Sequence, residues 1–127
     1  MKQTTLRTIL AAAVIAAAAP HARAGAGSYH EVSVSSNAAS GDTLTAYQSA
    51  DSNQYIGCSM EYNGPSDKYE VTCVAVDEDM KALSCSSYKP GFVAVAAGIG
   101  EYAFISFKCQ GPNLVWLHVW KSSTNLP

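Results

Sequence analysis

Apolar and polar residues alternate through most of the chain after residue 24, in short segments rich in Tyr, Val, Ile and Thr. Gly, Pro, Asn and Asp separate these segments, a pattern typical of strands that bury one face. It predicts strands near 29–36, 43–49, 54–62, 69–76, 81–86, 102–109 and 114–121, with a loop at 35–42 and a tail at 122–127. We therefore expect a mainly β protein, an antiparallel sandwich or partly closed barrel of about seven short strands.

One segment has helical instead of alternating periodicity. Pro90 suits the first turn of a helix, and four apolar residues then fall on one side at helical spacing: Phe92, Val95, Ala96 and Ile99. Gly98 and Gly100 would end the helix. The pattern predicts one short helix near 90–98, although Val93 and Val95 would also suit a strand.

The segment Asn63–Asp67 is dense in turn-forming residues and predicts a hairpin between the strands on either side. A register that sets Tyr62 opposite Tyr69 also sets Met60 opposite Val71, Cys58 opposite Cys73 and Ile56 opposite Ala75. One sheet face is then apolar throughout, whereas a slip of one residue would break the match.

All four cysteines lie after residue 24: Cys58, Cys73, Cys85 and Cys109. An even number in a small exported domain predicts two disulfides, and their spacing lacks the close pairs of a zinc site. We favour Cys58–Cys73 across the hairpin, which leaves Cys85–Cys109. The alternative pair, Cys73–Cys85, remains open, because those two also come opposite if the turn at 77–79 folds symmetrically.

The first 24 residues resemble a signal peptide. Lys2 and Arg7 precede an uncharged apolar run over 8–19, and Ala22-Arg23-Ala24 offers the small-x-small pattern that signal peptidases accept. The run is shorter than the ~20 residues of a membrane span. We expect a signal peptide at 1–24, cleavage near Ala24, and one disulfide-stabilised β domain at 25–127 in the periplasm or outside the cell.

The charged residues of that domain exclude some classes of binding partner. Residues 25–127 contain five lysines, no arginine and all ten Asp and Glu residues of the chain. Nucleic-acid sites depend on basic faces and arginine forks, so we expect no nucleic-acid partner and no anionic membrane surface.

The last predicted strand carries the clearest candidate site. Strict alternation places Leu114, Trp116, His118 and Trp120 on one face, and Val115, Leu117 and Val119 on the other. If the second face packs with Ile105 and Phe107, the first presents two tryptophans around a histidine, with Phe104 and Lys108 alongside. Such a face would bind a glycan or a protein. The alternative is that the helix covers this face and His118 is structural.

Catalytic signals are weak. The chain after residue 24 has two histidines, His30 and His118, and no Gly-x-Ser-x-Gly motif. Six carboxylates could in principle serve a hydrolase: Asp42, Asp51, Glu61, Asp67, Glu70 and Glu101. The carboxylates of 77–79 are expected to form a solvated turn, not a calcium site. We predict no catalytic residue, no metal and no cofactor.

The leading hypothesis is therefore an exported non-catalytic binding module. A secreted inhibitor or toxin acting on a foreign enzyme or cell is the alternative, with Gly64-Pro65 or Gly111-Pro112 as its exposed loop, and a small hydrolase is third.

A resemblance to other proteins is carried by five stretches of the chain: Tyr55–Cys58, Cys73–Asp77, Leu83–Cys85, Tyr102–Phe107, and Ser122-Ser123 with Leu126-Pro127. Together they resemble an uncharacterised family of small exported four-cysteine bacterial proteins. The resemblance implies export and carries over no catalytic residue.

Overall fold

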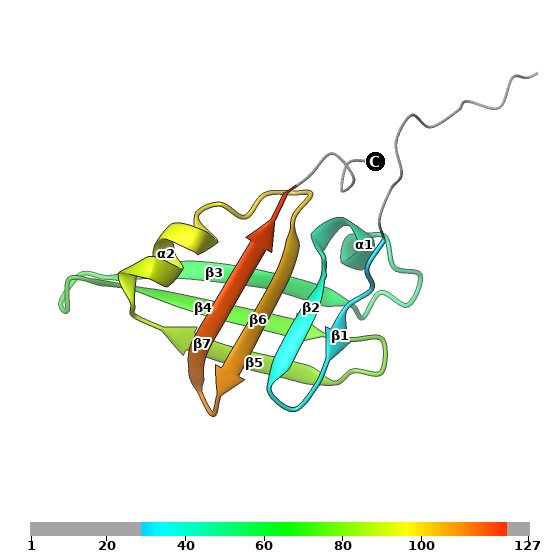
Figure 1. The fold of residues 1–127 in the computed structure, drawn as a ribbon, viewed down its shortest axis with the longest axis horizontal. Coiled ribbons are helices and arrows are strands. Elements are labelled where there is room, and N and C mark those ends of the chain that lie inside the picture. Colours follow the sequence, from blue (N-terminus) through cyan, green and yellow to red (C-terminus); the bar gives the residue numbers. More distant parts are fainter. Residues whose placement is uncertain (1–28, 122–127) are drawn as a thin grey trace, which may run out of the picture.

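The computed structural model describes residues 29–121, which form seven strands and two short helices (Figure 1). In chain order these are β1 (Ser33–Val34), β2 (Ala38–Asp42), α1 (Thr43–Tyr47), β3 (Tyr55–Asn63), β4 (Lys68–Val76), β5 (Ala82–Ser87), α2 (Pro90–Ala96), β6 (Phe104–Gln110) and β7 (Asn113–Trp120). The strands belong to a single sheet in the order β1-β2-β6-β7-β5-β4-β3. The predicted mainly β class is confirmed; the sheet is mixed, because β5 and β7 are parallel, and it is not closed.

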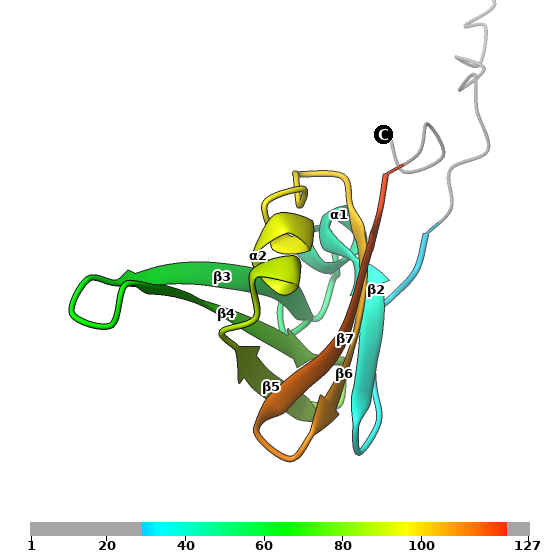
Figure 2. The same ribbon diagram turned by 60° about the vertical axis from the view of Figure 1, so that its left-hand side comes forward.

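The sheet bends into two layers, seen edge-on in Figure 2. One layer contains β1, β2, β6 and β7, and the other contains β3, β4 and β5. The layers meet where β5 runs beside β7, and the backbone bridge at this seam pairs Ser86 with Asn113. Away from the seam the layers diverge, and both helices lie between them: α1 contacts β2 and β3, and α2 contacts β3, β4 and β7.

The hydrophobic core fills the space between the two layers. Phe107 and Ile105 of β6 and Val71 of β4 are fully buried there. Further buried side chains come from the other strands and from both helices: Val34, Ala39, Ala46, Ile56, Cys85, Ala96, Leu114 and Leu117. Each strand of the core thus turns one face inward, as the alternating sequence pattern predicts.

The predicted β3–β4 register is confirmed. Tyr62 pairs with Tyr69, and Cys58 pairs with Cys73. Both favoured disulfides are present, Cys58–Cys73 and Cys85–Cys109. Cys73 does face Cys85 across β4 and β5, as the alternative required, but Cys85 bonds to Cys109 in the opposite layer.

The N-terminal strand predictions are partly wrong. Residues 43–49 were expected to form a strand, but Thr43–Tyr47 is helix α1. The Thr43 hydroxyl group donates to the carbonyl groups of Glu101 (2.7 Å) and Ala103 (3.3 Å), and so anchors the first turn of this helix to the start of β6. Over so short a segment, Leu44 and Ala46 suit either structure. Contacts with β2 and β3 stabilise the helix.

The expected loop at 35–42 contains β2, and the expected strand at 29–36 is reduced to β1. β2 pairs with β6 along its whole length. Its sequence, Ala-Ala-Ser-Gly-Asp, has low strand propensity, but small residues are required there: a Cβ at Gly41 would lie 2.9 Å from the Cα of Val32. Close packing thus overrides local preference.

The helix expected near 90–98 is confirmed as α2, Pro90–Ala96, with Pro90 in its first turn. Neither helix in the described part of the chain has the length and apolar character to span a membrane. The predicted signal peptide at 1–24 and the tail at 122–127 lie outside the described residues.

Candidate ligand-binding face

The five predicted site residues come together on the outward side of β6 and β7. The strand register sets them in rows that continue onto β2: Asp42–Phe104–Trp120, Ser40–Ser106–His118 and Ala38–Lys108–Trp116. We call these nine side chains the outer face. Among residues 29–121, no helix or strand lies over it (Figures 1 and 2).

Both tryptophans are accessible. Trp116 is 41% exposed and Trp120 is 51% exposed, and His118 between them is also exposed. Residues four apart on a strand are separated by roughly 13 Å, at about 3.3 Å per residue. The arrangement that buries this face under the helix does not occur, because α2 lies on the inner side of β7.

Two polar side chains lie beside the Trp116 ring. The Lys108 ammonium group lies 5.5 Å from the centre of the Trp116 ring, within the range of a cation–π contact. The His118 ring meets Trp116 edge-on, with 5.6 Å between ring centres. The face therefore alternates flat apolar rings with hydrogen-bonding groups along its length.

The other end of the outer face holds a pair that the sequence analysis missed. His30 packs edge-on against Phe104, with 5.3 Å between ring centres. The Asp42 carboxylate, which is 4% exposed, accepts a hydrogen bond from the His30 backbone N–H at 2.8 Å and lies 3.2 Å from His30 Nδ1. Finding the pair required recognising 38–42 as a strand, because that strand places Asp42 beside Phe104.

Two residues of β7 lie on the opposite face from the one predicted. Leu114 was expected beside the tryptophans but is buried in the core, and Val115 was expected in the core but is 47% exposed. The cause is a β-bulge opposite Lys108 and Cys109. Cys109 and Phe107 of β6 both point inward, two residues apart, whereas their partners Leu114 and Leu117 are three apart. The extra residue on β7 is accommodated by the bulge, and Val115 faces outward.

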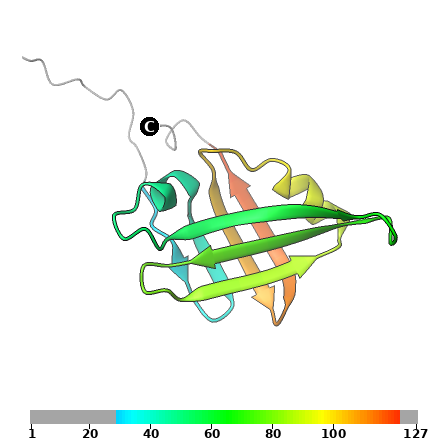
Figure 3. The ribbon, with the colours of Figure 1, turned by 180° about the vertical axis from the view of Figure 1, so that it is seen from behind.

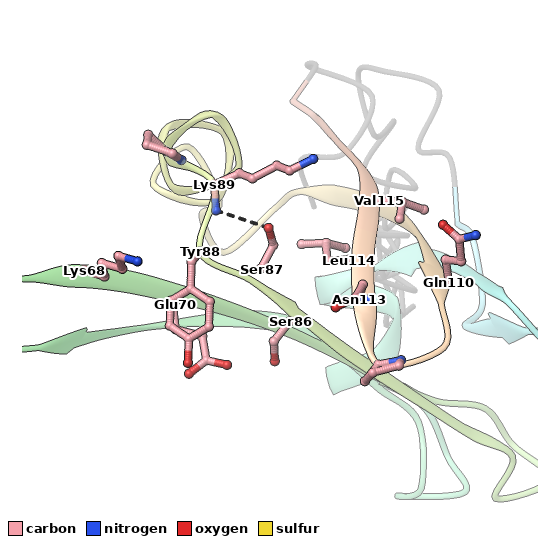
Figure 4. A pocket seen from close by; sticks show the side chains of 12 residues that line it. Lys68, Glu70, Ser86, Ser87, Tyr88, Lys89, Gln110, Asn113, Leu114 and Val115 are labelled. Carbon is pink, nitrogen blue, oxygen red and sulfur yellow. Dashed lines mark hydrogen bonds between the residues drawn. The ribbon is translucent and has the colours of Figure 1, made fainter. Parts of the chain in front are cut away.

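A groove of about 940 Å³ lies near the seam between the layers. Figure 4 shows Lys68 and Glu70 on the β4 side and Leu114 and Val115 on the β7 side, with Lys89 and Tyr88 between. A hydrogen bond with Glu70 raises the pKa of the Tyr88 hydroxyl group. The groove mixes lysines, a carboxylate and exposed apolar side chains, and none of the five predicted site residues lines it.

The β3–β4 hairpin projects away from the two layers (Figures 2 and 3). Near its tip, Tyr62 and Tyr69 pack against each other with 4.9 Å between ring centres, and both are about half exposed. The Tyr62 hydroxyl group donates to Asp67 at 2.6 Å, which raises the pKa of Tyr62. Gly64-Pro65 lies in the turn of this hairpin, and Gly111-Pro112 lies in the tight turn between β6 and β7.

The carboxylates at 77–79 form a turn. Asp77 Oδ1 accepts hydrogen bonds from the backbone N–H groups of Asp79 and Lys81, at 3.0 and 2.9 Å. Within residues 29–121, no three His, Cys, Asp or Glu side chains converge as metal ligands. The role of Asp77 here is that of a turn-capping side chain.

Three comparisons with known proteins give no match for this chain. No protein-family model matches it, and neither a curated protein nor a solved structure is significantly similar to it. Its resemblance to small exported four-cysteine proteins therefore stays a prediction, and the functional interpretation rests on the outer face.

Proposed function

We propose that this protein is an exported, non-catalytic binding module that holds a glycan against its outer face. The observation that carries the proposal is the exposure of both tryptophans, Trp116 and Trp120, on one strand face that no helix or strand of residues 29–121 covers. Exposed apolar side chains that gather on one face mark a binding surface, and the flat indole ring stacks well on the ring of a sugar.

The mixture of residues on this face favours a glycan over a protein partner. Ser106 and His118 lie between the aromatic rings and Lys108 lies beside Trp116, so stacking positions alternate with hydrogen-bonding groups. Sugars need both kinds of contact, because each ring carries apolar C–H faces and a rim of hydroxyl groups. The centre of a protein interface is depleted of charged residues by comparison.

Export is part of the proposal. Two disulfides stabilise the domain, and disulfides persist in oxidising compartments such as the periplasm and the cell exterior. The signal-like pattern at 1–24 supports the same location. A glycan of the cell envelope or of the surroundings is the kind of ligand that the protein would meet there.

Affinity measurements on variants of the outer face test the proposal. Residues 25–127 with the disulfides intact would be assayed against a panel of soluble polysaccharides, beside Trp116→Ala and Trp120→Ala. We expect each substitution to weaken binding roughly tenfold or more, since truncating a tryptophan that anchors a binding surface costs about 2 kcal/mol. Tyr47→Ala is the matched control, because Tyr47 is 89% exposed on α1 and outside the outer face. Equal binding by all three variants would refute the proposal.

An inhibitor that acts through a rigid loop is the second candidate. It is favoured by the projecting β3–β4 hairpin, where the Tyr62–Tyr69 pair and the Tyr62–Asp67 hydrogen bond hold the strands near the turn. Tyr62→Ser and Tyr69→Ser distinguish the candidates. Binding to a target protein that is lost in these variants but retained in Trp116→Ala and Trp120→Ala would favour the inhibitor.

A further inference from the structure

We propose that the glycan bound by the outer face is acidic, with a carboxylate that Lys108 recognises beside Trp116. This inference rests on the proposed function and adds the chemical class of the ligand. It follows from where the charges of the protein lie relative to the aromatic rings.

The protein is acidic, but its outer face is not. Nine of the ten carboxylates lie elsewhere: Glu31 and Asp51 near α1, Glu61, Asp67 and Glu70 on the β3–β4 hairpin, Asp77, Glu78 and Asp79 in the next turn, and Glu101 before β6. The tenth, Asp42, is buried and hydrogen-bonded to His30. The exposed charge on the outer face is therefore the Lys108 ammonium group.

Such segregation favours an anionic ligand. A carboxylated sugar that approached the hairpin or the acidic turns would meet like charges, whereas at the outer face it would meet Lys108. The carboxylates elsewhere thus disfavour other modes of approach, and the ammonium group selects one orientation.

The position of Lys108 ties the charge to the stacking surface. Its ammonium group is 5.5 Å from the centre of the Trp116 ring, and His118 meets the same ring edge-on. A sugar stacked on Trp116 would bring a carboxylate on its ring within reach of the Lys108 side chain, which is exposed and has a flexible stem. Ring stacking and the ion pair would then act on the same sugar unit.

A single lysine also limits the charge density of the ligand. Polyphosphate backbones are bound through several lysines and arginines at once, and this face has one lysine and no arginine. A single carboxylate on the sugar that stacks on Trp116 fits this one lysine better than a row of phosphates does.

Paired polysaccharides test the inference. Polygalacturonate, alginate and hyaluronan would each be compared with their carboxyl-reduced forms, which keep the chain and lose the charge. We expect at least one acidic form to bind, with the reduced form roughly two to five times weaker, the scale of an exposed ion pair. In Lys108→Gln the two forms should bind equally, at the affinity of the reduced form.

Lys81→Gln is the control, because it removes the same charge from an exposed lysine in the β4–β5 turn. It should behave as the unmodified protein does. Binding of a reduced form as tight as that of the acidic form would overturn the inference and leave the proposed function intact. Failure of every acidic and neutral polysaccharide to bind the folded protein would overturn both.

Discussion

Cys85 of β5 is bonded to Cys109 of β6 beside the seam where the two layers share the backbone bridge between Ser86 and Asn113. The Ser86 N–H also donates to the Pro112 carbonyl group at 3.0 Å. The disulfide therefore reinforces the pair of neighbouring strands that share the fewest backbone partners. Cys58–Cys73, in contrast, links strands that already pair along nine residues.

Removal of the two disulfides should have unequal effects. The closed loops span 24 and 15 residues, so chain entropy alone predicts costs that differ by about 0.4 kcal/mol. Cys85–Cys109 also holds the layers together. We therefore expect the double substitution Cys85→Ala with Cys109→Ala to lower the free energy of unfolding, measured in urea, by about 3–5 kcal/mol. Cys58→Ala with Cys73→Ala should lose at least 1 kcal/mol less. Equal losses would show that the seam does not depend on the bridge.

Two glycine substitutions should change stability in opposite directions. A Cβ at Gly41 would lie 2.9 Å from the backbone of Val32, so Gly41→Ala should destabilise the protein by about 1–3 kcal/mol. At Gly91, in α2, a Cβ would meet nothing within 4 Å, so Gly91→Ala should be stabilising by about 0.5–1 kcal/mol. Thermal unfolding of both variants checks the pair, and a stable Gly41→Ala would contradict the close approach of β2 and the preceding segment.

The Gln54 side chain connects the residue before β1, Val32, to the start of β3. Its Oε1 accepts a hydrogen bond from the buried N–H of Val32 at 2.9 Å, and its Nε2 donates to Asp51 at 2.9 Å. Gln54→Ala leaves that backbone N–H without a partner, which should cost about 1–3 kcal/mol in chemical unfolding. Asn53→Ala, at the exposed neighbouring position, is the control and should change stability little.

Asp51 should contribute to stability in a pH-dependent way. Hydrogen bonds from the Gln54 side chain and the Asn53 backbone hold its pKa below the ordinary value of 3.8. A lowered pKa in the folded state stabilises the protein above pH 3.8, and this contribution disappears as the pH falls through the folded pKa. Asp51→Asn should thus be less stable than the unmodified protein at neutral pH, and the difference should shrink below pH 3.8.

Unfolding curves of both proteins from neutral to acid pH provide the measurement, with Glu78→Gln as an exposed control. If Asp51→Asn and the unmodified protein differ in stability by the same amount at neutral and at acid pH, the charge of the Asp51 carboxylate does not cause the difference.

Prediction from the sequence was most successful where three constraints required the same register. In β3 and β4, the turn at 63–67, the apolar face and the Cys58–Cys73 pair all required the same register, and the structure has it. The second disulfide followed by elimination. The outer face was found from alternation in β7, and its neighbours Phe104 and Lys108 lie where an antiparallel β6 puts them.

The sequence failed where packing between distant segments decides the structure. The local sequence of 38–42 has no pattern typical of a strand. Its small residues are needed because Val32 lies close to Gly41, a contact that the local sequence does not indicate. The bulge in β7 arises because Leu114 and Leu117, three residues apart, pair with Cys109 and Phe107, which are two residues apart. Predicting it would require the β6–β7 register to be known. His30 and Asp42 are twelve residues apart and meet once β2 exists.

Acrylamide quenching of tryptophan fluorescence, with and without polysaccharide, tests the central claim most directly. The chain has two tryptophans, and both belong to the outer face, so the signal reports on this face alone. We predict strong quenching of the free, disulfide-bonded protein and clear protection when a uronate polysaccharide that it retains is added. Retention of the polysaccharide with unchanged quenching would place the binding site elsewhere and contradict the account.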